Sequence, residues 1–337
     1  MKLKIALLPI SACLLLSSSV AFAQDGYQPH ADSQDQKSGQ FDRSEKKQRS
    51  IFHRPKKKTA AEQFKLAQHL EAKKHFRSAR DAYNDLVHSW HTAPEAPLAQ
   101  LALAKNLFAH RKYEKAFNAF QYLIDYYSGH FKYNEVLDYQ LKIANQIMND
   151  RWGDVFFLPG FESPEKALPL LSKLIANAPN WGKTATVRLS IGMIHEELKD
   201  FESAVIAYES VEQHHAKSDE AEQASFRKAS CLFTLSEKTP RDEKRCRAAM
   251  SALASFLANH KQSDKQTEVE QNLEVLQKRL ATMYYERALF YDTISKRPAS
   301  ALIAYRDFLK KFPASERAQE VYTRMEVLEL QVKESSK

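Results

Sequence analysis

Histidines beside acidic residues are the first candidates for chemistry in this chain, because together they can hold a metal ion. His88 and His91 are spaced as helical neighbours, but no carboxylate or cysteine beside them completes a site. The adjacent His214 and His215 lack such partners too. The stretch 194–198, IHEEL, resembles the start of a zinc-protease helix but lacks its second histidine. We interpret these histidines as exposed helix residues and predict no metal site.

Other catalytic patterns are also missing from the sequence. It has no Gly-rich phosphate loop, no nucleophile elbow and no pair of carboxylates in a loop-rich segment. Acidic residues instead recur four positions from Lys or Arg, as on solvated helix faces. A lytic transglycosylase with a helical superhelix would need an added catalytic domain, and the repeats described below occupy the chain. The prediction is a non-enzymatic protein without a cofactor.

The N-terminus carries an export signal that can be interpreted in two ways. Residues 1–23 have a basic start, an apolar core and a small-x-small cleavage site at Ala21–Ala23, which predicts a removed signal peptide. Alternatively, Cys13 follows Ile-Ser-Ala as in a bacterial lipobox and would become a diacylated N-terminus. The three Leu after Cys13 disfavour that alternative, since a mature lipoprotein normally begins with polar residues. Both alternatives take the protein out of the cytoplasm.

Two further cysteines lie roughly equidistant from one predicted turn, residues 236–242. Cys231 and Cys246 would therefore face one another in a helical hairpin, and an oxidising periplasm would permit a disulfide. Helix axes are usually ~8–10 Å apart, whereas a disulfide needs Cα atoms within about 7 Å. The alternative is two small buried thiols, and the sequence does not decide between them.

The helices that must position any functional side chain follow a repeating pattern. Residues 112–129 form the clearest copy, with apolar residues at i, i+3, i+4 and i+7 and a Gly at the end. Its core is an Ala, three residues, an aromatic or Leu, two residues and an apolar residue. The six copies are Ala79-Tyr83-Leu86, Ala116-Phe120-Leu123, Ala167-Leu171-Leu174, Ala204-Tyr208-Val211, Ala249-Leu253-Phe256 and Ala301-Tyr305-Phe308.

A second helix precedes each copy in a fixed register. Ala67 lies 12 residues before Ala79, and Ala104 lies 12 residues before Ala116. Small residues at both positions let the two helices of a pair approach closely, which is typical of tetratricopeptide repeats. The predicted fold is an all-α, tetratricopeptide-like right-handed superhelix of about six helix pairs, with a C-terminal capping helix from residue 315 to about 333. The aromatic-rich stretch 151–161 is predicted to be an inserted loop.

Composition agrees with this fold. Only seven of the 337 residues are Gly, and the formal charge of +8 is mild for the length, so nucleic-acid binding is not predicted. Residues 24–58 have no apolar periodicity and end in a basic run, which predicts a disordered basic linker that could touch anionic headgroups. Order is expected to begin near Thr59, a good N-cap, with Glu62 three residues on.

Three stretches, 76–83, 112–127 and 299–313, resemble the BamD/ComL family, the tetratricopeptide component of the outer-membrane β-barrel assembly machinery. The resemblance spans about residues 60–330. The chain departs from the family in its early lipobox, in having more repeats than usual, and in the extra 151–161 segment.

This resemblance implies a periplasmic scaffold on the inner face of the outer membrane. Repeats over 59–180 would bind unfolded outer-membrane precursors, and repeats over 181–333 would dock a BamA-like barrel-assembly protein, with membrane association peripheral or through a lipid anchor. The peptide groove of the first two repeats is predicted from inward helix positions. These are Phe64, Gln68, Glu71, Leu101, Lys105 and Phe108.

Alternatives remain for both the groove and the function. Phe64 and Phe108 could instead close the core between repeats. The second candidate function is a periplasmic tetratricopeptide adaptor that coordinates cell-wall synthesis with envelope constriction. Such adaptors typically carry an N-terminal coiled coil, and residues 24–58 contain no heptads.

Overall fold

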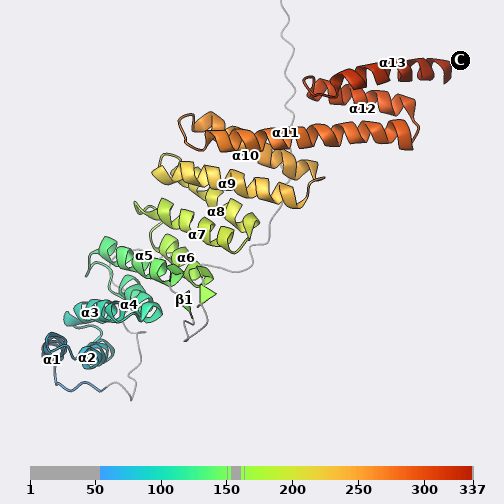
Figure 1. Cartoon of the computed structure of the whole chain (residues 1–337). Helices are drawn as coiled ribbons and strands as arrows, with labels where there is room; N and C mark the ends of the chain where they lie inside the picture. Colours follow the sequence, from blue (N-terminus) through green and yellow to red (C-terminus); the bar gives the residue numbers. More distant parts are fainter. Residues whose placement is uncertain (1–53, 150, 153–160, 163, 336–337) are drawn as a thin grey trace, which may run out of the picture. The chain divides into compact units, whose positions relative to one another are not determined.

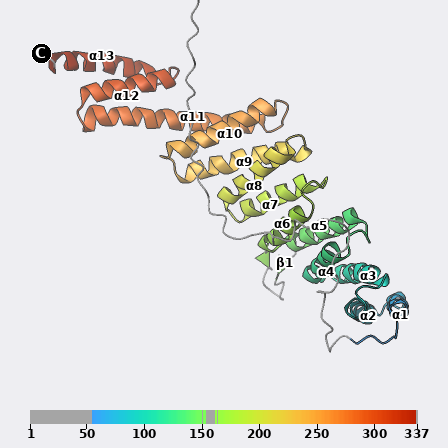
Figure 2. The same cartoon turned by 180° about the vertical axis from the view of Figure 1, so that it is seen from behind.

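The computed structural model describes residues 54–149, 151–152, 161–162 and 164–335, all within one compact unit, residues 45–337. Thirteen α-helices follow one another in these ranges, and consecutive helices pack side by side (Figures 1 and 2). They are α1 (Ala60–Ala72), α2 (Phe76–Ser89), α3 (Glu95–Ala109), α4 (Tyr113–Tyr126), α5 (Tyr133–Asn149), α6 (Leu168–Asn177), α7 (Thr184–Glu197), α8 (Phe201–His215), α9 (Asp219–Lys238), α10 (Glu243–Asn259), α11 (Gln266–Leu289), α12 (Pro298–Lys311) and α13 (Ala318–Ser335).

Six antiparallel pairs and a final helix account for this order. The pairs are α1–α2, α3–α4, α5–α6, α7–α8, α9–α10 and α11–α12, and α13 packs on α12. The predicted all-α fold of tetratricopeptide-like pairs is confirmed. The capping helix is also present, beginning at Ala318 rather than 315, and its Val321 and Leu328 are buried in the last core cluster.

The repeated pattern marks the core of each pair. All six alanines of the pattern are buried, as are the aromatic or Leu and the apolar residue that follow each one. The leading helices contribute the buried Ala67, Ala104, Ala144 and Ala229. In the fourth pair Gly192 takes this place, and a Cβ there would lie 2.3 Å from Cε1 of Tyr208. The tight approach therefore requires glycine at this position.

Buried glutamines hold the first three pairs together. Gln63, Gln100 and Gln140 each lie four residues before the small residue of a leading helix, and all three are buried. Gln63 Nε2 donates to the carbonyl of Ala82 at 3.1 Å, and Gln100 Nε2 donates to that of Ala119 at 2.8 Å. These bonds add a second donor to carbonyl groups of the second helix and join the two helices without any charge.

The start of the ordered chain differs slightly from the prediction. Thr59 caps α1 as expected, accepting from the backbone N–H of Glu62 at 3.3 Å. The backbone N–H groups of Lys56 and Lys57 also donate to Oε1 of Gln63, at 3.1 and 3.2 Å. The last residues of the predicted disordered linker, 24–58, are therefore bound to α1. Residues 1–53, with the predicted signal peptide and Cys13, lie outside the described residues.

The insertion in the third pair contains a short hairpin. Strand β1 (Arg151–Trp152) pairs antiparallel with β2 (Phe161–Glu162). A 3-10 turn, η3 (Pro164–Ala167), then leads into α6. The rest of the predicted loop, 153–160, lies outside the described residues. No helix in the described ranges is both long and apolar enough to cross a bilayer.

Candidate binding surfaces

The predicted aromatic residues of the N-terminal surface lie against other rings. The ring of Phe64 is 5.9 Å from that of Tyr83, and the ring of Phe108 is 6.0 Å from Tyr113 and 5.5 Å from Tyr139. Both phenylalanines are half-buried against the first core cluster. Each therefore contributes to packing between helices and stays partly exposed.

Glu71, assigned to the groove by sequence, has an internal partner. Tyr83 donates its hydroxyl to Glu71 Oε2 at 2.8 Å, and Tyr208 donates to Glu196 Oε2 at 2.6 Å in the fourth pair. Each bond joins residues 12 positions apart. Burial, reinforced by the carboxylate, raises the pKa of both tyrosines. This contact is thus part of the repeat, and it uses the Glu71 carboxylate to join α1 to α2.

Lys105 stands beside an aromatic residue that the sequence analysis missed. Its Nζ lies 2.7 Å from Glu135 Oε1 and 5.6 Å from the centre of the Tyr139 ring. Lys142 Nζ lies 5.5 Å from the same ring, and within the described residues it has no carboxylate partner. Phe108, Lys105, Tyr139 and Lys142 therefore form one surface over α3 and α5, which we call the N-terminal aromatic surface.

The other two predicted groove residues, Gln68 and Leu101, differ in their exposure. Gln68 on α1 is exposed and makes no side-chain hydrogen bond within the described part of the chain. Leu101 on α3 is half-buried against the first core cluster. Gln68 is available to a ligand, whereas Leu101 contributes mostly to packing.

The last pair contains a break in helical regularity. Helix α11 continues as a π-helix, η4 (Phe290–Ile294), where the N–H of Ser295 donates to the carbonyl of Phe290 at 2.8 Å. The added residue shifts the tyrosine–carboxylate spacing from 12 to 13, so Tyr305 donates to Asp292 Oδ2 at 3.1 Å. π-Bulges are frequent at functional sites.

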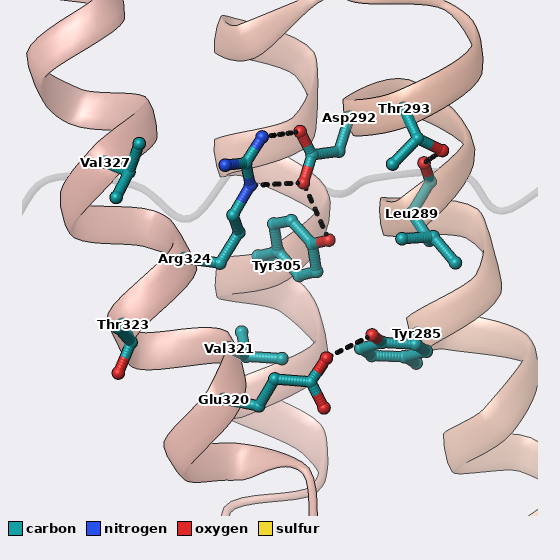
Figure 3. Close-up of a pocket in the computed structure, with 10 residues that line it drawn as sticks. All are labelled: Tyr285, Leu289, Asp292, Thr293, Tyr305, Glu320, Val321, Thr323, Arg324 and Val327. Atoms are coloured by element: carbon teal, nitrogen blue, oxygen red, sulfur yellow. Dashed lines mark hydrogen bonds and ion pairs between the residues drawn. The ribbon is translucent and has the colours of Figure 1, made fainter.

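Arg324 on α13 completes this arrangement with two hydrogen bonds (Figure 3). Its Nε and Nη2 donate to the two Asp292 oxygens at 2.8 and 2.7 Å. The Asp292 side chain is only 3% exposed, against 42% for Arg324. The hydrogen bonds from Arg324 lower the pKa of Asp292 despite its burial. This pair ties the capping helix to the π-helix.

A pocket of about 470 Å³ opens beside this ion pair. Figure 3 shows its two polar walls, the Asp292–Arg324 pair and the hydrogen bond from Tyr285 to Glu320, which measures 2.8 Å. Its apolar lining consists of Leu289, Val321 and Val327. The pocket lies where α11, α12 and α13 meet and presents both apolar and charged groups.

A second charged cluster, the Tyr284 cluster, joins α10, α11 and α12. Tyr284 donates to Glu243 Oε1 at 2.7 Å and accepts from Arg247 at 2.8 Å and Lys311 at 2.9 Å. Arg287 donates to Glu243 Oε2 at 2.8 Å. The hydrogen bond from Tyr284, together with those from Arg287 and Arg247, lowers the pKa of Glu243 to about 2.

The structure distinguishes the two alternatives for the cysteines. Cys231 and Cys246 are both free and buried. Cys231 packs in the cluster around Tyr208, whereas the Cys246 thiol points to α11 and donates to the Leu276 carbonyl at 3.6 Å. Burial raises the pKa of the Cys231 thiol to about 12. The two side chains therefore serve separate cores, in agreement with the alternative of two small buried thiols.

The histidine pairs are not part of a group of metal-ligating side chains within the described residues. The rings of His214 and His215 are 6.4 Å apart at the end of α8. Within the described residues, no group of three or more His, Cys, Asp or Glu side chains is arranged to hold a metal ion.

Comparison with known families decides the relationship. Residues 162–335 match the family model of YfiO, described as outer membrane lipoprotein, which is just over half of the chain. The chain belongs to this family. Residues 64–130 match a tetratricopeptide repeat model, which covers most of the first two pairs. The predicted BamD/ComL membership is thereby confirmed, and both families are non-catalytic protein-interaction scaffolds.

Solved structures add only distant likenesses, and no curated protein matches. YrrB, a tetratricopeptide protein with an unusual peptide-binding site, has 13% identity, covering 63% of this chain and 92% of its own, with a TM-score of 0.32. A tetratricopeptide repeat protein from Parabacteroides merdae has 13% identity, covering 80% and 98%, with a TM-score of 0.30. A thermophilic tetratricopeptide protein from Thermus thermophilus has 15% identity, covering 64% and 99%, with a TM-score of 0.28. These scores support no argument about function.

Proposed function

We propose that this YfiO-family protein is a non-enzymatic scaffold at the periplasmic face of the outer membrane that assists the assembly and insertion of β-barrel proteins. The observation that carries the proposal is the family match over residues 162–335, which spans α6 to α13. In this proposal the C-terminal pairs dock the BamA-like barrel-forming partner. They offer the pocket beside Asp292 and exposed apolar side chains such as Ile303, which is 69% exposed.

The N-terminal pairs would bind extended segments of unfolded precursors. The N-terminal aromatic surface supports this role because it combines ring area with cations. Tyr139 is flanked by Lys105 and Lys142, and Phe108 lies beside it. Aromatic rings give contact area at low entropic cost, and Lys142 can pair with a backbone carbonyl or a terminal carboxylate. Exposed Gln68 would add a hydrogen-bonding group on α1.

The mode of membrane attachment follows from the N-terminus. The family is one of outer membrane lipoproteins, which favours acylation of Cys13 over cleavage after Ala23. Mass spectrometry of the purified chain distinguishes the two: an acylated N-terminal Cys13 supports the anchor, and an N-terminal Gln24 excludes it.

Co-purification from detergent-solubilised envelopes tests the proposed function. The wild-type chain should recover a large outer-membrane barrel protein together with unfolded barrel precursors. The Lys105→Gln/Lys142→Gln variant should lose most of the precursors and keep the barrel protein, because its C-terminal pairs are unchanged. Lys217→Gln/Lys244→Gln removes two charges elsewhere and should retain both.

A different set of partners would contradict the proposal. If the wild-type chain recovers cell-wall synthases or constriction proteins and no outer-membrane barrel, the protein is the adaptor considered in the sequence analysis. If both lysine variants lose precursors equally, binding depends on net charge rather than on the N-terminal aromatic surface.

A further inference from the structure

A basic pocket lies where the turns of the first two pairs meet. Its lining comes from the α1–α2 turn, the start of α2 and the α3–α4 turn, and its volume is about 750 Å³. The rings of Phe76 and His110 pack against each other there at 4.7 Å, and Asn106 Nδ2 donates to the Phe76 carbonyl at 3.3 Å. These contacts hold the two turns together. The lining residues are Lys74, His75, Phe76, Arg77, Ser78, Arg80, His110 and Lys112.

The charges of this pocket are of one sign. Lys74, Arg77, Arg80 and Lys112 line it, and no lining residue is acidic. None of the four has a carboxylate partner among the residues that the structure describes. Repulsion from Arg80, followed by slight desolvation and repulsion from Lys115 and Arg77, outweighs attraction to Asp81 and lowers the pKa of Lys112. Like charges are therefore crowded together and outweigh the nearby Asp81, so the net positive field favours an external anion.

The backbone adds to this preference. Helices α2 and α4 both begin at the pocket without a side-chain cap. Their positive ends reinforce the four cationic side chains.

We propose that this pocket binds the phosphate groups of anionic membrane lipids, so that the first two pairs rest against a bilayer surface. The phosphate chemistry is shared with free phosphate, but two observations favour the lipid. Phe76 is 37% exposed among the cations, and basic residues beside an exposed aromatic side chain are typical of interfacial binding. The family is one of outer membrane lipoproteins. The pocket shares no residue with the N-terminal aromatic surface, so the inference does not depend on peptide binding.

Acetylation of individual lysines, quantified by mass spectrometry on the full purified chain, tests this site. The deprotonated lysine amine attacks the acetylating reagent, so a phosphate at the pocket slows the reaction both by shielding and by raising the pKa of Lys112. Four additives are compared: vesicles of phosphatidylglycerol and phosphatidylcholine, vesicles of phosphatidylcholine alone, inorganic phosphate, and polyglutamate.

Anionic vesicles should slow acetylation of Lys74 and Lys112 at least about threefold relative to phosphatidylcholine alone, because each basic residue near an anionic surface adds to the attraction. Lys217 and Lys261, exposed at other turns, should change less than about 1.5-fold under the same conditions. Protection by both vesicles and inorganic phosphate supports the proposal and shows that the phosphate group is recognised. Protection by vesicles alone supports it and shows that a charged surface is needed.

A charge-neutralised variant provides the second measurement. Arg77→Gln/Arg80→Gln should abolish the protection of Lys74 and Lys112, whereas Lys217→Gln/Lys261→Gln, with the same loss of net charge, should leave it intact. Circular dichroism on both variants checks that the helices are kept. The proposal is overturned if protection survives in Arg77→Gln/Arg80→Gln or if the control lysines are protected equally. It is also overturned if inorganic phosphate protects but vesicles do not, if only polyglutamate protects, or if no additive protects Lys74 and Lys112.

Discussion

The first two helix pairs and the C-terminal helices α10–α13 use polar groups in different ways. In α1–α4, buried amides join the helices: Gln63 and Gln100 donate to backbone carbonyls across each pair. In α10–α13, charged groups do so, through the Asp292–Arg324 pair and the cluster around Tyr284. Both regions share the same buried register of small and large residues.

This difference decides which charges are available to ligands. Neutral amides leave cations such as Lys142 and Arg80 without internal carboxylate partners in the described N-terminal pairs. In the C-terminal pairs many charged side chains form ion pairs with one another. The side chains of Ile294 and Ile303 are exposed on the surface of these pairs. We therefore propose that the N-terminal pairs receive polar or anionic ligands and that the C-terminal pairs receive a protein partner.

The largest effect is expected where a buried charge would lose its partner. Arg324→Met leaves the Asp292 carboxylate, which is 3% exposed, without its bidentate partner. We expect the packing of α13 on the last helix pair to lose about 2–4 kcal/mol of stability. This is somewhat less than for a fully buried ion pair, because Arg324 is partly exposed. Hydrogen exchange of α13 amides should accelerate while α1–α4 amides stay unchanged. Equal acceleration in both regions would show that the ion pair does not act locally.

The shared register predicts the next largest effect. Gly192→Ala places a Cβ 2.3 Å from Tyr208 Cε1 and should cost about 1–3 kcal/mol of unfolding free energy, because the ring is itself buried. Gly182→Ala is the matched control, since a Cβ at Gly182 meets nothing within 4 Å. Urea titrations of both variants measure the difference. A Gly192→Ala variant as stable as the control would contradict the close helix approach.

The amide contact of the N-terminal region predicts a smaller loss. Gln100→Leu removes the hydrogen bond that the Gln100 amide donates to the Ala119 carbonyl, which keeps its backbone partner within α4, and should cost about 0.5–1.5 kcal/mol of unfolding free energy. Because no charge is involved, the loss should be the same at pH 5 and pH 8. Gln68→Leu, at an exposed position, should change the free energy of unfolding by less than about 0.5 kcal/mol. A pH-dependent effect of Gln100→Leu would contradict the statement that neutral amides rather than charged groups join the N-terminal helices.

Acid should weaken the C-terminal region through Glu243. Its folded pKa of about 2 lies below the unfolded value of about 4.3, so its contribution is complete above the unfolded value and is lost as pH falls toward 2. Glu243→Gln should cost only about 1 kcal/mol at pH 7, since the guanidinium partners are partly exposed, and should flatten this acid response. Hydrogen exchange of α10–α12 between pH 7 and pH 3 measures it; an unchanged acid response in the variant would assign the effect to other groups.

The fold was predictable because small residues at fixed positions mark each helix pair in the sequence. Ala79 and its five counterparts mark helix pairs by size alone, and close packing makes that signal local and additive. The pairing of Tyr83 with Glu71, and of Tyr208 with Glu196, could also have been found, since the spacing of 12 repeats within the chain. That regularity would have shown that Glu71 also has a hydrogen-bond partner within its own pair.

The surfaces were harder to predict because they join helices of different pairs. Tyr139 and Lys142 lie on α5, and Lys105 lies on α3. The repeat pattern does not indicate that Lys105 and Lys142 approach the same Tyr139 ring. The π-helix at 290–294 adds one residue to a helix whose sequence shows no Pro or Gly there, so Asp292 rather than Thr293 faces Tyr305. The sequence left the disulfide open because the direction of the Cys246 thiol, toward Leu276, depends on the neighbouring α11.

Site-specific photo-crosslinking in living cells tests the division of labour between the two regions most directly. A photoreactive residue replaces Lys142 on α5, Ile303 on α12 or, as a control, Lys261. The account predicts heterogeneous crosslinks to nascent barrel precursors from position 142, one discrete crosslink to a large outer-membrane barrel protein from position 303, and neither from position 261. Precursor crosslinks from position 303 with none from position 142, or the same partners from both, would contradict it.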